Sequence, residues 1–232
     1  MEKISTNPVV SSDSQILSKV NRRYFLRSAG VAAATGAFIL GACTEKDLAG
    51  DDTVELGAGD VGILNYAYAL EQLEAAFYIQ VMTTPYLNMT DEEKWILTDI
   101  RDHEIVHREF FKKALGDNAI KGLTPNFASI DFQDRMSVLK SAMLFEDTGV
   151  SAYNGAGKLI KDVQYLAVAG KIVSVEARHA SAIADLLNPN ALEFANGQIN
   201  SMGLENAYSP SIILRNVQPF VMNKISGNLL PR

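Results

Sequence analysis

Two short residue patterns, each present twice, contain the residues of this sequence whose types and spacing could do chemistry. In the first, a His follows a Glu by three residues, at Glu104–His107 and Glu176–His179. In the second, a Tyr follows a Glu by seven residues, at Glu71–Tyr78 and Glu146–Tyr153. The order Glu, Glu-x-x-His, Glu, Glu-x-x-His is that of the ligands of a carboxylate-bridged pair of metal ions inside a four-helix bundle. Such a pair would react with dioxygen, peroxide or ferrous iron.

The charges of the predicted ligands suit a pair of divalent metal ions. Four carboxylates neutralise two such ions, which matters because uncompensated charge in a bundle core is costly. Each His adds a neutral, directional nitrogen, and it shares a helix face with the Glu three residues before it. The predicted metal ligands are Glu71, Glu104, His107, Glu146, Glu176 and His179.

Glu74 competes with Glu71 for the first ligand position, because it lies one helical turn further on and shares the same face. The repeated Glu-to-Tyr spacing decides between them. It aligns Glu71 with Glu146, whereas Glu74 aligns with Gly149. Glu71 is therefore the predicted ligand, and Glu74 is expected either beside the ligands or partly exposed.

Tyr78 and Tyr153 lie two helical turns after their glutamates, on the same helix face. Each could donate a hydrogen bond to a ligand carboxylate or lie on an electron-transfer path. Each could equally be a core Tyr whose hydroxyl is satisfied elsewhere. The spacing leaves these alternatives open.

The segment His103–His107, with the sequence HEIVH, also matches the signature of zinc hydrolases. In that alternative both of its His residues would bind one zinc ion and Glu104 would be the base. The only other His in the chain, His179, lies 72 residues further on. The alternative also leaves the second Glu-x-x-His unexplained, so we expect His103 beside the ligands or at the surface.

Hydrophobic periodicity predicts an all-α chain without strands. Four long helices are expected over 60–82, 91–115, 131–161 and 163–187, and a short one over 210–225. Thr90 to Glu93 has the sequence of a capping box, which would start the second helix, and Gly116 would end it. The aromatic residues expected in the core are Trp95, Phe110, Phe111 and Phe145.

The four predicted glutamate ligands each lie near the middle of a predicted helix, so side-by-side packing would bring them to one level. Helices of about 25 residues are about 37 Å long, and roughly fourteen extended residues reach about 46 Å. Residues 116–130 could therefore run the length of the bundle between the second and third helices. This long B–C crossover is expected of a four-helix bundle with one such connection.

Residues 1–43 have the features of an export signal and are set apart from the fold. Arg22 and Arg23 precede an aromatic and apolar stretch, as in twin-arginine signals. The weakly apolar run over 29–42 is too short to span a bilayer. It leads into Leu40–Cys43, which resembles a lipobox, in which the Cys is lipidated and becomes the new first residue. The sequence therefore predicts a periplasmic or cell-envelope lipoprotein that is attached to a membrane through Cys43.

The rest of the chain divides into a tether over 44–58, a helical bundle over 59–189 and a C-terminal extension over 190–232. The extension indicates either a packed tail or an interface. Cys43 is the only Cys, which excludes disulfides and thiolate metal sites from the exported part. The formal net charge of −6 does not favour nucleic acid as a partner.

The chain between about residues 60 and 188 resembles the ferritin-like superfamily, and more closely its exported, desiccation-related branch. The segments that carry the resemblance are Leu64–Tyr78, Asp102–His107, Thr148–Ala156 and Val175–Ala180. The resemblance implies a ferritin-like four-helix bundle. Similarity to bacterioferritin-like sites implies three kinds of ligand. Glu104 and Glu176 would bridge the two ions. His107 and His179 would each bind one ion, and Glu71 and Glu146 would be terminal ligands.

The same resemblance implies two metal ions, with iron as the first choice and manganese as the alternative. The protein would then oxidise ferrous iron or reduce peroxide or dioxygen outside the cytoplasm. The desiccation-related branch also implies another class, a non-catalytic stress-related binding protein. A membrane anchor and a C-terminal extension fit poorly with a closed storage shell. The oligomeric state stays open, and a dimer is compatible with the sequence.

The export signal generates a first testable prediction. Replacing Cys43 by Ser should release the protein from membranes, because a hydroxyl cannot carry the thioether-linked lipid. Replacing both Arg22 and Arg23 by Lys should leave the protein in the cytoplasm. Cell fractionation followed by immunoblotting measures both outcomes. Normal export of the double-Lys variant would refute the twin-arginine interpretation.

Overall fold

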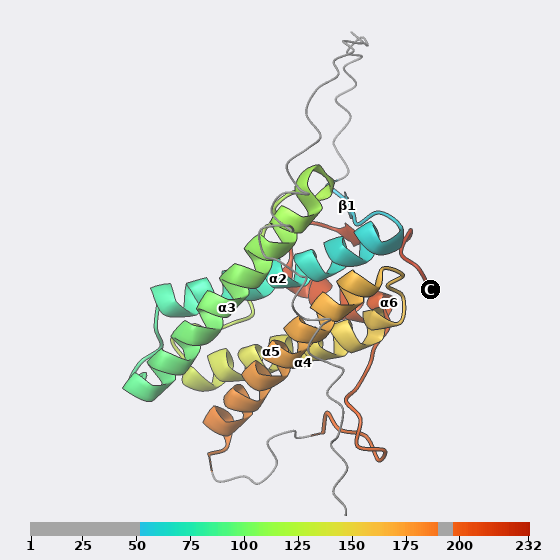
Figure 1. Ribbon diagram of the computed structural model, residues 1–232. Helices are drawn as coiled ribbons and strands as arrows, with labels where there is room; N and C mark the ends of the chain where they lie inside the picture. Colours follow the sequence, from blue (N-terminus) through green and yellow to red (C-terminus); the bar gives the residue numbers. More distant parts are fainter. Residues whose placement is uncertain (1–51, 190–196) are drawn as a thin grey trace, which may run out of the picture. The chain divides into compact units, whose positions relative to one another are not determined.

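The computed structural model describes residues 52–189 and 197–232 (Figure 1). The predicted export signal, with Arg22, Arg23 and Cys43, lies outside these residues. The described residues belong to one compact unit, Gly50–Arg232. Among them, no helix is both long enough and apolar enough to cross a bilayer.

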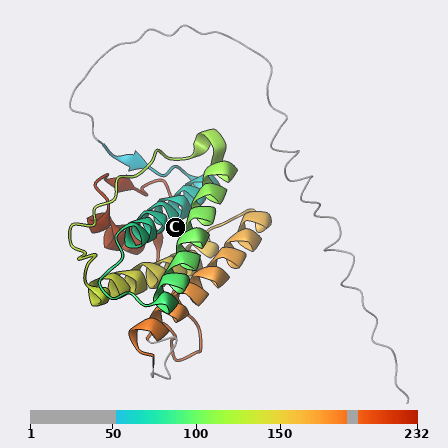
Figure 2. The ribbon, with the colours of Figure 1, turned by 90° about the vertical axis from the view of Figure 1, so that its left-hand side faces the viewer.

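Four long helices form the body of the fold. They are α2 (Gly59–Thr83), α3 (Asp91–Leu115), α4 (Arg135–Gly157) and α5 (Val163–Leu187) (Figure 1). α2 packs closely against α3, and α4 against α5, so the chain forms two helical hairpins (Figure 2). The prediction of an all-α four-helix bundle is confirmed.

The residues that flank the helices explain where they begin and end. The Thr90 side chain accepts a hydrogen bond from the Glu93 N–H, and the Glu93 side chain bonds back to the Thr90 N–H, which is the predicted capping box. Gly116, with a positive φ of 55°, ends α3 as expected. Asp134 caps the first turn of α4. This helix therefore starts later than the predicted residue 131, and it also ends earlier, at Gly157.

The connection between α3 and α4 runs along α2 (Figure 2). It begins with a 3-10 turn, η1 (Gly116–Asn118). Two side chains of α2 hold it in place. Asn65 Oδ1 accepts a hydrogen bond from the Ile120 N–H at 3.0 Å, and Gln72 Oε1 accepts one from the Leu123 N–H at 2.9 Å. The crossover is thus fixed to the helix that carries the first predicted ligand.

The C-terminal extension contains one short helix, α6 (Pro210–Val217), followed by a 3-10 turn, η2 (Gln218–Phe220). The helix predicted over 210–225 is therefore too long. Pro219 explains the early end, because it has no amide hydrogen and its ring crowds the preceding turn. Ile213 and Val217 are buried, which favours the packed tail over the interface.

A small parallel sheet joins the start of the described chain to its C-terminal extension. β1 (Val54–Glu55) pairs with β2 (Ile225–Ser226), so the prediction that no segment forms a strand is wrong. Two-residue strands are too short to produce a recognisable alternation. Leu56, which was assigned to the tether, is fully buried. The end of that segment is therefore part of the packed fold.

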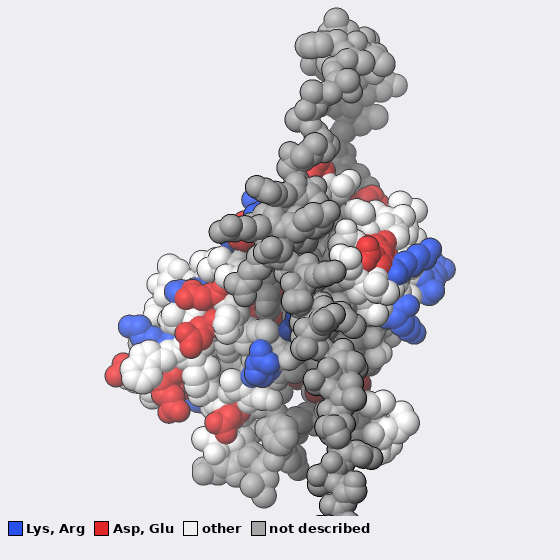
Figure 3. Space-filling view, in the orientation of Figure 1, with Lys and Arg blue, Asp and Glu red and all other residues white. Residues whose placement is uncertain are grey.

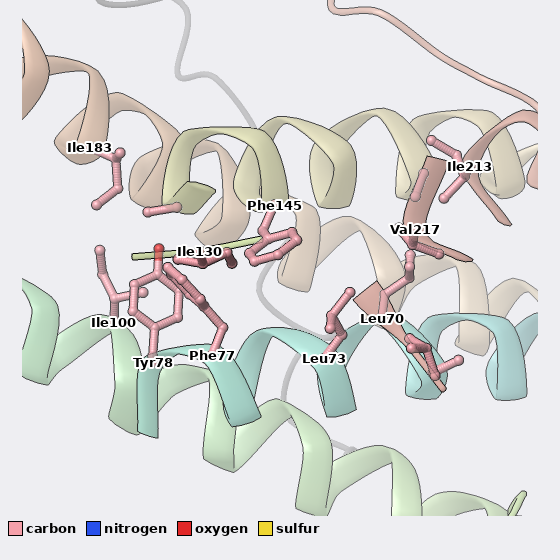
Figure 4. Packing of buried hydrophobic residues seen from close by; sticks show 14 of the residues in the cluster. Leu70, Leu73, Phe77, Tyr78, Ile100, Ile130, Phe145, Ile183, Ile213 and Val217 are labelled. Carbon is pink, nitrogen blue, oxygen red and sulfur yellow. The ribbon is translucent and has the colours of Figure 1, made fainter. Parts of the chain in front are cut away.

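Buried apolar side chains fill the space between α2, α4 and the C-terminal extension (Figure 4). Phe77 makes edge-to-face ring contacts with Tyr78 and Phe145, at centroid distances of 5.1 and 5.0 Å. Phe145 also contacts Phe220 of the extension, at 4.9 Å. This aromatic group ties both hairpins and the extension together.

The buried face of α3 corrects one sequence expectation. Its members follow each other at three- and four-residue spacing, and they are Glu93, Leu97, Ile100, Glu104, His107, Phe111 and Leu115. Trp95 falls outside this stripe and is 71% exposed, so its assignment to the core is wrong. Glu104 and His107 occupy positions where a bundle helix normally places apolar residues.

Gly155 generates a prediction about stability, because it lets the C-terminal extension lie directly on α4. The Tyr208 N–H donates to the Ser151 carbonyl at 3.1 Å, and a Cβ on Gly155 would lie 1.8 Å from the Tyr208 carbonyl oxygen. Gly155→Ala should displace the extension and lower the free energy of unfolding by about 1–3 kcal/mol. Gly157→Ala is the matched control, since its Cβ would meet Leu166 at 3.7 Å, an ordinary contact distance. Urea unfolding curves compare the variants, and equal stability would contradict the prediction.

Candidate metal centre

The four long helices bring all six predicted ligands together in the bundle core. Their potential ligand atoms form two overlapping groups, each within 4.8 Å. The first group is Glu71, Glu104, His107 and Glu176, and the second is Glu104, Glu146, Glu176 and His179. Surface acidic and basic side chains are interspersed on the face shown in Figure 3. The four cluster glutamates, by contrast, are 0% exposed.

His107 faces three carboxylates of the first group. The distances from its Nδ1 are 2.9 Å to Glu176, 3.4 Å to Glu71 and 3.7 Å to Glu104. The Nδ1 atom is buried and has no hydrogen-bond partner among the described residues. It therefore points into the space that the three carboxylates share.

His179 occupies the equivalent place in the second group. Its Nδ1 lies 2.8 Å from Glu104, 3.4 Å from Glu146 and 4.0 Å from Glu176. This Nδ1 also lacks a hydrogen-bond partner within the described part of the chain. The two groups are thus built alike, as the repeated sequence patterns predict.

Glu104 and Glu176 belong to both groups and turn one oxygen towards each His. Glu104 Oε1 faces His179 and Oε2 faces His107, whereas Glu176 Oε1 faces His107 and Oε2 faces His179. In the described structure, none of these four oxygen atoms has a partner with hydrogen-bond geometry. Buried carboxylates without partners are costly, and metal ions bind through such oxygen and imidazole nitrogen atoms. The cluster is therefore compatible with a two-metal site.

Tyr78 and Tyr153 hold the outer oxygens of the other two glutamates. The Tyr78 hydroxyl donates to Glu146 Oε1 at 2.5 Å, and the Tyr153 hydroxyl donates to Glu71 Oε1. Each Tyr therefore bonds to the Glu of the opposite hairpin, rather than to the Glu of its own helix. Burial raises the pKa of both tyrosines well above the ordinary value, so both hydroxyls keep their protons and act as donors.

His103 lies outside both groups. It is exposed, and its Nδ1 lies 2.9 Å from Nε2 of His179, the ring nitrogen that faces away from the carboxylates. A partner on this outer nitrogen fixes the orientation of the His179 ring. His103 and His107 therefore do not point to a common centre, as the zinc-hydrolase alternative would require.

Glu74, for which the sequence left two positions open, is buried beside the cluster. It is 3% exposed, so the partly exposed alternative is wrong. Burial raises its pKa well above the usual range, and repulsion from Glu176 adds to this effect. It belongs to neither four-residue group.

Burial also makes negative charge on the cluster glutamates costly. It raises the pKa of Glu71 to about 7 and raises the pKa values of Glu146 and Glu176. Repulsion from Glu104 adds to the rise at all three. Without metal, these carboxyls therefore keep their protons to a higher pH than exposed glutamates do.

The two histidines respond in the opposite way. Burial alone would lower their pKa values, but contacts with the carboxylates raise the pKa of His107 to about 12 and that of His179 to about 10. The same contacts overcome the effect of burial on Glu104 and lower its pKa to about 2. In the metal-free protein, protons on the histidines thus partly supply the positive charge that two divalent ions would bring.

Comparison with protein families agrees with this geometry. The family model described as the ferritin-like domain matches residues 59–189, which contain the four long helices and the whole cluster. The chain belongs to the ferritin-like domain family. No curated protein matches it. For this ferritin-like protein, the exported and desiccation-related branch stays a prediction.

The shifted pKa values predict how the metal-free protein responds to pH. Between about pH 4.5 and 7, the folded form keeps a proton on Glu71 that the unfolded chain loses, and Glu146 and Glu176 act in the same direction. Above about pH 6.5, folded His107 and His179 also keep protons that the unfolded chain loses. The free energy of unfolding should therefore fall as the pH rises from about 5 to about 8.

Urea unfolding in the presence of a chelator measures this dependence. Saturating metal should weaken or reverse it, because metal ions bind the deprotonated ligands. A chelated protein that becomes more stable over the same pH range would contradict the charges assigned to the cluster.

Proposed function

We propose that this ferritin-like protein holds two metal ions, iron as the first choice and manganese as the alternative. The observation that best supports the proposal is the placement of Glu104 and Glu176, each with one oxygen towards His107 and one towards His179. A carboxylate directed at two centres is suited to bridge two ions. His107 and His179 would each bind one ion through Nδ1.

Glu71 and Glu146 would be the terminal ligands, each binding one ion through Oε2. Their Oε1 atoms are already occupied by the tyrosine hydroxyls. These hydrogen bonds fix the rotation of the carboxylates and leave the second oxygen directed at the neighbouring His, at 3.4 Å in both cases. Such support of a ligand typically tunes metal affinity and reactivity.

The proposed reaction is the oxidation of ferrous iron or the reduction of peroxide or dioxygen. A bound pair of iron or manganese ions supplies the electron transfer. Six side chains do not fill the coordination shells of two ions, so a position stays open for the small oxidant or the ferrous substrate. The helices contribute by excluding bulk water from the carboxylates, all of which are 0% exposed.

We also propose that the protein works outside the cytoplasm, attached to a membrane through Cys43. The support comes from the sequence, in which Arg22 and Arg23 precede the Leu40–Cys43 segment. Twin-arginine export carries folded proteins, so the bundle would take up its metal before crossing the membrane.

Metal analysis of the purified protein tests the proposed centre. We predict about two ions per chain in the wild type, and one or none in His107→Ala and in His179→Ala, because ligands of a shared site act together. His103→Ala is the control, since it lies outside both groups and should retain two ions at saturating metal. One zinc ion that is lost in His103→Ala and kept in His179→Ala would favour a zinc hydrolase instead.

The wild type and a Glu146→Ala variant test the proposed reaction. The reduced, iron-loaded wild type should consume dioxygen or peroxide within seconds, measured with an oxygen electrode and a peroxide assay. Glu146→Ala should lose this activity and stay folded by circular dichroism, because removing a buried carboxylate relieves repulsion in the metal-free bundle. If the metal-loaded wild type is inert to both oxidants, the proposed reaction is wrong. The non-catalytic, stress-related binding role then takes its place.

A further inference from the structure

Glu74 is a fifth buried carboxylate whose place in the cluster the proposed ligand set does not explain. It is 3% exposed and is therefore almost completely removed from water. The electrostatic interactions that raise its pKa are with four glutamates of the cluster: Glu176, Glu104, Glu71 and Glu146. A negative charge on the Glu74 carboxylate is strongly disfavoured unless a positive charge comes close to it.

Gly149 makes the space that Glu74 occupies. A Cβ on Gly149 would lie 2.9 Å from Glu74 Oε1 and 3.5 Å from Glu176 Oε2. The carboxylates of Glu74 and Glu176 therefore approach each other across a gap in α4 that only a Gly leaves open. A Cβ at position 149 would be too close to Glu74 Oε1, so the Glu74 carboxylate would have to shift from its present position.

The same distances show which metal position Glu74 approaches. Glu176 Oε2 is the oxygen that faces His179, at 4.0 Å, whereas Oε1 faces His107, at 2.9 Å. A Cβ on Gly149 would meet Glu74 together with the Oε2 side of Glu176, which supports placing the Glu74 carboxylate on the side of the His179 position. The carboxylate thus adds to a group that already contains three others.

The internal repeat shows that this arrangement is one-sided. The alignment that pairs Glu71 with Glu146 places Gly149 opposite Glu74, so only one of the two hairpins carries the extra carboxylate. His103 breaks the repeat at the same metal position, because it contacts His179 and its counterpart in the second hairpin is Val175. Both departures from symmetry therefore modify the His179 position.

We infer that Glu74 is a seventh metal ligand, which binds the ion at the His179 position through the space left by Gly149. This inference rests on the proposed two-metal function. The His107 position keeps the smaller ligand set, so the two ions are inequivalent.

A bound Glu74 changes the charge balance of the centre. Four carboxylates match two divalent ions, whereas five match one divalent and one trivalent ion. A fifth anionic ligand therefore stabilises the trivalent state of the ion at the His179 position, since like and unlike charges are weakly screened in a buried site. Removing Glu74 should raise the reduction potential of that ion.

Titration of the metal-free protein with Co²⁺ tests the inference without an activity assay. Calorimetry should show two binding events in the wild type, and Glu74→Ala should weaken one of them about 10- to 100-fold. Gly149→Ala should weaken the same event by displacing Glu74. In the double variant, Gly149→Ala should add nothing to the effect of Glu74→Ala, because the two changes act on one contact. Gly170→Ala is the matched control, since a Cβ there meets nothing within 4 Å.

The position of the effect is tested in two single-ion backgrounds. In His107→Ala, at Co²⁺ concentrations that load the remaining His179 position, Glu74→Ala should lower Co²⁺ affinity and change the visible Co²⁺ spectrum. In His179→Ala it should change neither. Where Glu74→Ala fails to fold, Glu74→Gln replaces it, because the amide keeps the shape without the charge.

The outcomes separate the inference from the proposed function. A wild type that binds two Co²⁺ ions with both affinities unchanged in Glu74→Ala overturns the seventh ligand and leaves the two-metal centre intact. An equal effect in both single-ion backgrounds overturns the assignment to the His179 position. A wild type that binds no pair of ions overturns the proposed function, and the inference fails with it.

Discussion

The rest of the structure depends on the cost of keeping carboxylates at the centre of the bundle. Four glutamates with 0% exposure and a fifth with 3% exposure share one small volume. In such a place the loss of hydration and the mutual repulsion of anions are both large, and a few apolar contacts cannot offset them. Protons on the carboxyls and on the two histidines reduce the cost, and metal ions would reduce it further. Metal binding at this cluster would therefore be coupled to folding stability.

The surrounding fold holds α2, the helix that carries Glu71 and Glu74, in place against the repulsion between the carboxylates. The crossover is tied to α2 by Asn65 and Gln72. The C-terminal extension in turn holds the crossover, since the Met222 N–H donates to the Thr124 carbonyl at 2.9 Å. Segments without a chemical role thus keep the first hairpin from moving away from the second. This explains why the extension is packed, although the ligands all lie outside it.

The sequence predicted the helices and the ligand cluster because both depend on short-range periodicity. A metal centre in a bundle needs the same residue types on each helix face, so Glu-x-x-His at positions 104 and 176 is visible without coordinates. What depends on contacts between distant segments was not predictable. The crossed hydrogen bonds of Tyr78 and Tyr153 are one example, and the pairing of β1 with β2 is another. Trp95 is exposed because its position on α3 lies outside the buried stripe, and aromatic character alone does not place a side chain in the core.

The repeat itself is most informative where it fails. Two hairpins with identical faces would create two equivalent metal positions, and such a centre would have no preferred ion to oxidise first. Gly149 stands opposite Glu74, and Val175 stands opposite His103, so the second hairpin lacks both of the side chains that the first contributes. His103 contacts the outer ring nitrogen of His179, and the inferred Glu74 ligand would reach the same position from within the core. An ion there would sit in a more negative and more tightly oriented environment than its neighbour. A difference between two bound ions would therefore be encoded in Glu74 and His103, the two residues at which the hairpins depart from the repeat.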